Sequence, residues 1–208
     1  MRQEKDPRVI RTKILLYNAL INLTEKVGIN KVNVRNLTEE AGLNRATFYL
    51  HYRDIYEFLE KVKQYMFQGL QCIFDHSDFN NLPGSEERSI QVFTLVFEYL
   101  SDNHLFFKTM LGPNGDPSYK EQLKEFMKKN FYKDHLEFQP DAQKMLVPRD
   151  YLVAHVTSSI LGIIQHWFES NMNFSPKEMA LIVYRLLESN INELSGETDN
   201  RNSSRLED

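Results

Sequence analysis

The residues best suited to chemistry lie together in one basic and aromatic segment, residues 44–53 (NRATFYLHYR). Arg45 can donate two hydrogen bonds to guanine O6 and N7, and the methyl group of Thr47 can contact a thymine methyl. Donors that suit contacts with DNA phosphates, which position a protein without reading sequence, follow at Tyr49, His51 and Arg53. The segment therefore predicts a surface that recognises double-stranded DNA.

Two short helices joined by a tight turn are expected to present this segment. Asn33 is a suitable N-cap for a helix over residues 34–41, and Gly42 can adopt the left-handed conformation that the turn requires. Asn44 caps a second helix that runs to about Tyr52, with its free amide end able to face a phosphate. A helix, a turn and a helix over residues 33–52 predict a helix-turn-helix, whose second helix lies in the major groove.

Side chains before the turn extend this candidate surface. Lys31, Asn33 and Arg35 flank the start of the first helix and can clamp the adjacent DNA backbone. Phe48 and Tyr52 fit the core of a small domain better than contact with DNA. A plain helical hairpin with a few aromatic residues stays open as an alternative, because helix-turn-helix patterns have many false positives.

The charge distribution agrees with a DNA-contacting head on a separate body. Residues 1–53 contain 10 Lys and Arg against 5 Asp and Glu, whereas the whole chain carries a net charge of −4. A basic first quarter can be attracted to nucleic acid even though the rest of the chain is acidic. Charge blocks of this size are also common on solvated faces, so a solvated face is the alternative interpretation of this asymmetry.

Apolar spacing and helix signals predict an all-α chain of about nine helices. Eight Gly and seven Pro leave little room for the turns of an all-β fold. Beyond the two short helices, we expect helices at residues 8–27, 54–74, 86–102, 104–111, 117–136, 148–170 and 176–194. The expected domains are a three-helix DNA-binding domain over 8–68, a helical dimerisation and sensing domain over 69–194, and a disordered tail over 195–208.

Other function classes lack their signatures. The sequence contains no phosphate-binding Gly-rich loop, no His-Glu-x-x-His motif and no Gly-x-Ser-x-Gly elbow, so we expect no enzyme, no metal and no cofactor. An enzyme assembled from scattered His, Glu and Tyr stays an open alternative. The most apolar stretch, residues 151–168, is interrupted by polar side chains, which argues against a membrane span. The single Cys72 fits a reducing compartment, so a cytoplasmic location is expected.

Residues 12–62 resemble the N-terminal domain of TetR-family regulators. The resemblance rests above all on Thr47-Phe48-Tyr49-x-His51-Tyr52 after Ala41-Gly42-Leu43, with matching positions at Ile14, Ala19, Leu20, Leu23, Gly28, Val34, Leu37 and Leu59. It implies an all-helical homodimer with an N-terminal DNA-binding domain and a C-terminal domain for dimerisation and ligand sensing. Residues 162–171 and 175–180 also resemble a C-terminal domain type found in part of that family, some members of which act through protein partners.

The resemblance also assigns roles within the helix-turn-helix. Thr47, Tyr49 and His51 occupy family DNA-contact positions, and Arg45 and Leu50 occupy variable positions that set specificity. Ile55 stands where the family usually has Lys. That phosphate contact is therefore either missing or supplied by Arg53, which puts the affinity for DNA in doubt.

Two apolar helix faces in the second half of the chain predict a dimer interface. Their members are Leu152, Val156, Ser159 and Ile163 on one helix and Met179, Val183, Leu186 and Ile191 on the next. Two such helices from each subunit would form a four-helix bundle. A palindromic operator needs two recognition helices about one DNA turn, ~34 Å, apart. Packing of both faces within one subunit is the alternative.

Bulky side chains supply a candidate pocket for an effector. Its proposed lining is Phe67, Phe97, Phe107, Met110, His155 and Trp167, although such residues at helical spacing more often form plain core. His155 and His166 are interpreted as core histidines and not as metal ligands. The effector, a small molecule or a protein partner, is left open.

The sequence as a whole predicts a DNA-binding transcriptional regulator. We expect a repressor that binds a palindromic operator as a dimer and is released by a small molecule. A helical protein-interaction module with a weakened DNA-binding head is the alternative.

Overall fold

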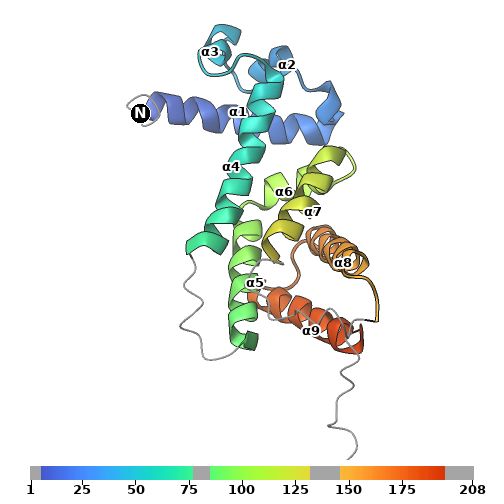
Figure 1. Ribbon diagram of the computed structural model, residues 1–208. Helices are drawn as coiled ribbons and strands as arrows, with labels where there is room; N and C mark the ends of the chain where they lie inside the picture. The colour runs from blue at the N-terminus through green and yellow to red at the C-terminus, as the bar shows by residue number, and fades with distance from the viewer. Residues whose placement is uncertain (1–5, 77–84, 132–145, 195–208) are drawn as a thin grey trace, which may run out of the picture. The chain divides into compact units, whose positions relative to one another are not determined.

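The computed structural model of the protein describes residues 6–76, 85–131 and 146–194, and all regular structure in these ranges is helical (Figure 1). The elements are α1 (Pro7–Val27), the 3-10 turn η2 (Ile29–Lys31), α2 (Val34–Glu40), α3 (Arg45–Tyr49), α4 (Ile55–His76), α5 (Ser85–Asp102), α6 (His104–Leu111), α7 (Pro117–Phe131), α8 (Arg149–Glu169) and α9 (Pro176–Leu194). The predicted all-α fold of about nine helices is confirmed. The predicted end of α7 at residue 136 and the tail over 195–208 lie outside the described residues.

The helices belong to two compact units. The first comprises the described residues up to Leu70 together with Asn103–Gln122, and the second comprises Gln71–Asp102 and the described residues from Leu123 onward. Helices α4 and α7 each contribute to both units. The expected domain division after residue 68 follows the order of the chain, whereas the first unit also takes in α6 and the start of α7.

The first unit is built around α1, which packs against α2 and α6, while α2 packs against α3. Leu16 and Leu20 of α1, Leu37 of α2 and Phe48 of α3 are all buried at the centre of this packing. Burial of apolar side chains of this size stabilises a fold by about 1.5–3 kcal/mol for each side chain. The helix-turn-helix is therefore held by a shared core and not by its short helices alone.

Local sequence signals set the helix ends in the first unit. The Asn44 side chain accepts a hydrogen bond from the Ala46 N–H at 2.9 Å, which begins α3 where the sequence predicts. Gly28 and Gly42 have φ values of 84° and 64°, in the region that favours glycine. The tight turn between α2 and α3 depends on this conformation of Gly42.

The second unit is a helical bundle in which α9 packs along α5 and also contacts α8. Helix α9 begins at a capping box, because the Ser175 N–H donates to the Glu178 carboxylate at 2.7 Å and the Ser175 hydroxyl oxygen accepts from the Glu178 N–H at 3.4 Å. The buried Trp167 ring lies edge-on to Phe97, with 5.2 Å between ring centroids, and its Nε1–H donates to the Phe174 carbonyl at 2.9 Å. The N–H group of the buried indole therefore has a hydrogen-bond partner.

Candidate DNA-binding surface

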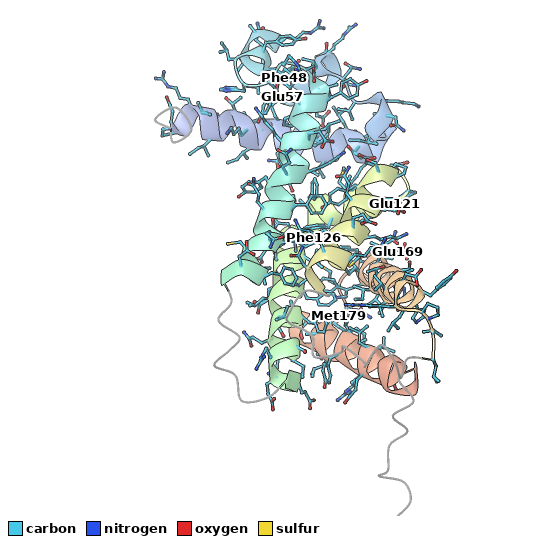
Figure 2. All side chains as sticks on the ribbon, in the orientation of Figure 1. Phe48, Glu57, Glu121, Phe126, Glu169 and Met179 are labelled. Atoms are coloured by element: carbon cyan, nitrogen blue, oxygen red, sulfur yellow. The ribbon has the colours of Figure 1, made fainter. Side chains whose placement is uncertain are left out.

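Helix α3 is divided between one buried anchor and exposed neighbours. The Phe48 side chain is 0% exposed and packs against the rings of Tyr52 and Phe58, at centroid distances of 5.4 and 6.0 Å. Figure 2 shows Phe48 at the start of α4. In contrast, Tyr49 is 57% exposed and Leu50 is 79% exposed. The predicted core roles of Phe48 and Tyr52 are confirmed, and the other face of α3 is open to solvent.

The first turn of α3 presents two proposed base-reading side chains. The Thr47 N–H donates to the Asn44 carbonyl at 2.9 Å, and the Asn44 side chain caps the same turn. Arg45 is exposed and Thr47 is half-buried. His51 is half-buried, and its N–H donates to the Phe48 carbonyl at 2.9 Å. The cap therefore fixes the backbone from which Arg45 extends.

Asn33 has a structural role that limits its predicted contact with DNA. Its side-chain oxygen accepts from the Asn36 N–H at 3.1 Å, while its own N–H donates to the Asn36 side chain at 2.8 Å. The Asn33 amide also donates to the Lys31 carbonyl at 3.4 Å. The side chain is thus committed to capping α2, whereas Lys31 and Arg35 are exposed.

Glu39 brings together two arginines that the sequence proposes as DNA contacts. Its Oε1 lies 3.1 Å from Arg35 Nε and 3.9 Å from Arg45 Nη2. The sequence reasoning did not identify Glu39. The spacing of four residues between Arg35 and Glu39 on one helix was the available signal, because residues at this spacing are neighbours on a helix surface. The contact between Glu39 and Arg45 depends on the fold of the turn.

Arg53 is held by two acidic residues at the start of α4. Its Nε lies 2.9 Å from Asp54 Oδ2, and its backbone N–H donates to the Glu57 carboxylate at 2.6 Å. Figure 2 labels Glu57 at this end of α4. The hydrogen bond and the charge of Asp54 raise the pKa of Arg53 above its ordinary value. Arg53 can therefore replace the missing lysine contact only in competition with Asp54.

Charged and polar side chains hold α2 on α1. The Glu40 carboxylate accepts from Lys26 Nζ at 2.9 Å and from the Asn22 amide at 3.4 Å. The hydrogen bond from Lys26 lowers the pKa of the Glu40 carboxyl. Glu39 and Glu40, adjacent in sequence, thus face different partners.

The loop between α6 and α7 is tied to the helices that carry the candidate surface. The Asn114 carbonyl accepts from the Ile29 N–H at 3.0 Å, and the Asn114 amide donates to the Glu25 carbonyl at 3.0 Å. Asp116 lies 2.6 Å from Nζ of the buried Lys63 of α4. These contacts join α1, α4 and the start of α7 in one unit.

The six proposed pocket residues do not fall in one unit. Phe67, Phe107 and Met110 belong to the first unit, and Phe97, His155 and Trp167 belong to the second. Phe97, Phe107, Met110 and Trp167 are buried among core side chains. The expectation that His155 and His166 are core histidines is wrong, because both occupy exposed positions on α8. Within the described ranges, no cluster of His, Cys, Asp and Glu is arranged to hold a metal ion.

The proposed dimer interface needs correction, because part of it is already buried within one chain. Leu152, Val156, Met179 and Val183 are 1–5% exposed and form the core of the second unit. For these four, the alternative of packing within the subunit holds. Ser159 and Ile163 are half-buried and Leu186 is 45% exposed, so these side chains remain candidates. Ile191 lies in α9, and its side chain is outside the described residues.

No helix in the described part of the chain is long and apolar enough to cross a membrane.

Comparisons with known proteins place the sequence in a family. Residues 16–62 match the family described as "Bacterial regulatory proteins, tetR family", and residues 87–189 match the one described as "Transcriptional regulator C-terminal region". The uncharacterised HTH-type transcriptional regulator YxbF of Bacillus subtilis is 24% identical over 173 residues, which is 81% of this chain. This chain spans 43% of the length of that relative.

Solved structures show the same fold. A TetR transcriptional regulator from Streptococcus agalactiae matches with a TM-score of 0.61 and 19% identity, over 90% of this chain and 99% of that chain. The regulator FadR from Bacillus subtilis, solved in complex with stearoyl-CoA, matches with a TM-score of 0.52 and 14% identity, over 84% and 96% of the two chains. The two family matches and this fold establish that the chain belongs to the TetR family of DNA-binding transcriptional regulators, which are not enzymes.

Proposed function

We propose that this regulator binds a palindromic operator as a homodimer and represses transcription from it, with α3 in the major groove. The observation that carries the proposal is the division of α3 between its buried anchor, Phe48, and the exposed Arg45, Tyr49 and Leu50. A recognition helix needs this division, because one face must be fixed by the domain while the other meets base edges.

The proposed contacts separate into base readers and phosphate clamps. Arg45 reads a guanine, while Thr47 and Leu50 make apolar contacts with thymine methyl groups. The proposed phosphate contacts come from Lys31, Arg35, Tyr49, His51 and Arg53, with the Asn44 end of α3 facing a further phosphate. The ion pair between Arg53 and Asp54, together with Ile55, supports a lower affinity for DNA than a lysine at position 55 would give.

The homodimer is proposed to form through α8 and α9. Ser159, Ile163 and Leu186 keep accessible surface in the single chain. Ser158 and Gly162 are exposed on α8, and their small size allows a second helix to approach closely. Two copies of α3 related by a two-fold axis would read the two halves of a palindrome.

A small-molecule effector is proposed to release the operator. Support comes from the aromatic core of the second unit around Phe97 and Trp167, and from FadR, a protein of the same fold that was solved with stearoyl-CoA. Stearoyl-CoA is therefore the first compound to test for release of bound DNA. Release by stearoyl-CoA at a fixed protein concentration would support an effector of this type, and release only by a protein partner would contradict it.

Selection of bound duplexes from a random DNA pool tests the DNA-binding proposal. We expect the wild-type chain to enrich an inverted repeat, and the Tyr49→Ala variant to bind the enriched duplex more weakly. Tyr65→Ala is the matched control, because Tyr65 is also exposed but lies on α4, away from α3. Enrichment of no sequence, or equal loss in both variants, would contradict the proposal.

A further inference from the structure

The exposed face of α2 carries the Glu39 carboxylate, which forms ion pairs with two arginines. Glu39 Oε1 lies 3.1 Å from Nε of Arg35 and 3.9 Å from Nη2 of Arg45. The three side chains are 55–72% exposed, so the group lies on the surface of the helix-turn-helix. Glu39 thus places a negative charge among the side chains proposed to meet DNA, which is itself negatively charged.

The adjacent carboxylate, Glu40, has a different role. It pairs with Lys26 at 2.9 Å and accepts from the Asn22 amide, so it holds α2 on α1. Its side chain is 24% exposed, against 61% for Glu39. Within the described part of the chain, the ion pairs of Glu39 join it to Arg35 and Arg45 and not to α1. Its charge is therefore available to influence how the two arginines meet DNA.

We propose that Glu39 is a positioning residue that sets the specificity of DNA reading through Arg45. The inference rests on the proposed function, in which Arg45 reads a guanine. A guanidinium has five N–H donors, so Arg45 can keep its Nη2 near Glu39 and still donate to guanine O6 and N7. On DNA without that guanine, Arg45 can contact only phosphates. The Glu39 carboxylate then competes with the phosphates for the Arg45 guanidinium, and its negative charge repels them. Glu39 therefore weakens binding to wrong sequences more than binding to the operator.

The test compares Glu39→Gln with Glu40→Gln, which removes the same charge from the next residue of the same helix. The probes are the duplex that the wild-type chain enriches from a random pool and a scrambled duplex of the same composition. Dissociation constants for both are measured by fluorescence anisotropy over a range of salt concentrations. The ratio of the two constants gives the specificity, and the salt dependence reports the number of phosphate contacts.

We expect Glu39→Gln to bind the scrambled duplex about three- to tenfold more tightly, as expected for the loss of two exposed ion pairs of ordinary strength. The slope of the logarithm of its binding constant against the logarithm of the salt concentration should steepen by about one unit, because the arginines released from Glu39 gain a phosphate contact. The specificity ratio should therefore fall. Glu40→Gln should leave that ratio unchanged, even if it weakens binding to both duplexes equally through a less well held α2.

A double-mutant cycle tests whether Glu39 acts through Arg45. In an Arg45→Ala background, Glu39→Gln should no longer change the specificity ratio, because the side chain that Glu39 positions is absent. A role confined to helix stability would not produce this coupling. Glu39→Ala should repeat the effect of Glu39→Gln, and the thermal unfolding temperature of each variant checks that it is folded.

Three results would overturn the inference. If the wild-type chain enriches a duplex but Glu39→Gln leaves the specificity ratio unchanged, the inference about Glu39 is overturned. The proposed function stands in that case. An effect of Glu39→Gln that persists in the Arg45→Ala background shows that Glu39 does not act through Arg45. A wild-type chain that enriches no duplex overturns the proposed function and this inference together.

Discussion

At the scale of single residues, the helix-turn-helix assigns opposite roles to neighbours in sequence. Phe48 is fully buried between Tyr52 and Phe58, and the next residue, Tyr49, is more than half exposed. The first stabilises the domain, and the second is available to a partner. Substitutions at these two positions should therefore separate stability from DNA binding.

The Phe48→Ala substitution should lower the free energy of unfolding by about 3–5 kcal/mol, because it leaves a cavity in the core of the first unit. Tyr49→Ala is the control, and it should change that free energy by no more than about 0.5 kcal/mol because the side chain is exposed. Urea unfolding followed by circular dichroism measures both. Equal destabilisation by the two substitutions would contradict the assigned roles.

Residue roles that depend on local signals could be predicted from the sequence, and side-chain pairs could not. The caps at Asn33 and Asn44 follow from residue type and helix period. The ion pairs that join Glu39 to Arg45 and Arg53 to Asp54 depend on the rotamers and on the turn, so they required the structure. The exposure of His155 could not be predicted either. Its apolar neighbours in the sequence do not determine which side of α8 faces solvent.

At the scale of elements, a buried ion pair joins α4 to the start of α7. Lys63 is 5% exposed, and its Nζ lies 2.6 Å from Asp116 and 2.9 Å from Glu60. Burial alone would lower the pKa of Lys63, but the hydrogen bonds to Asp116 and Glu60 outweigh it and raise the pKa. Burial likewise opposes the ionisation of Asp116, yet the bonds from Lys63 and Ser118 lower its pKa. The sequence could not predict the contact between Lys63 and Asp116, because the two residues lie far apart along the chain.

The Lys63→Met substitution should lower the free energy of unfolding at neutral pH by about 2–3 kcal/mol, somewhat below the loss for a fully buried pair because Asp116 keeps some exposure. The lowered pKa of Asp116 means that its stabilising contribution is lost as the pH falls through that folded-state value. The raised pKa of Lys63 means that its contribution is lost as the pH rises through the folded-state value.

The difference between wild type and Lys63→Met should therefore be largest between about pH 5 and pH 9, between the ordinary pKa values of Asp and Lys. Urea unfolding at a series of pH values measures it. Lys61→Met is a suitable control, because Lys61 is exposed and pairs with Glu57 on the surface of the same helix. A difference independent of pH would show that the ion pair does not cause the stability change.

At the scale of the whole molecule, helix order was predictable and the grouping of helices was not. Periodicity and caps located the helices, including the starts of α7 and α9 at Pro117 and Pro176. Membership of α6 in the first unit depends on contacts with α1 that no local signal records. For the same reason, the apolar faces of α8 and α9 could not be divided in advance between core and partner surface.

The Gly162→Leu substitution tests the proposed dimer. A Cβ atom added at Gly162 meets no atom within 4 Å in the single chain, and the position is exposed, so the fold of one subunit should be retained. A close helix approach at this position in the dimer would be blocked, and the dimer dissociation constant should rise at least about tenfold. Analytical ultracentrifugation measures it, with Gln91→Leu at an exposed position on α5 as the control. An unchanged dimer would place the interface elsewhere.

The most direct test of the central claim, that α3 reads base sequence through Arg45, is the affinity of the Arg45→Ala variant for two duplexes. One is the duplex that the wild-type chain enriches from a random pool, and the other is its scrambled counterpart. We expect the variant to lose about 1–3 kcal/mol of binding free energy on the enriched duplex, with a much smaller loss on the scrambled one. Equal losses on both duplexes would contradict the claim, because Arg45 would then contact only phosphates.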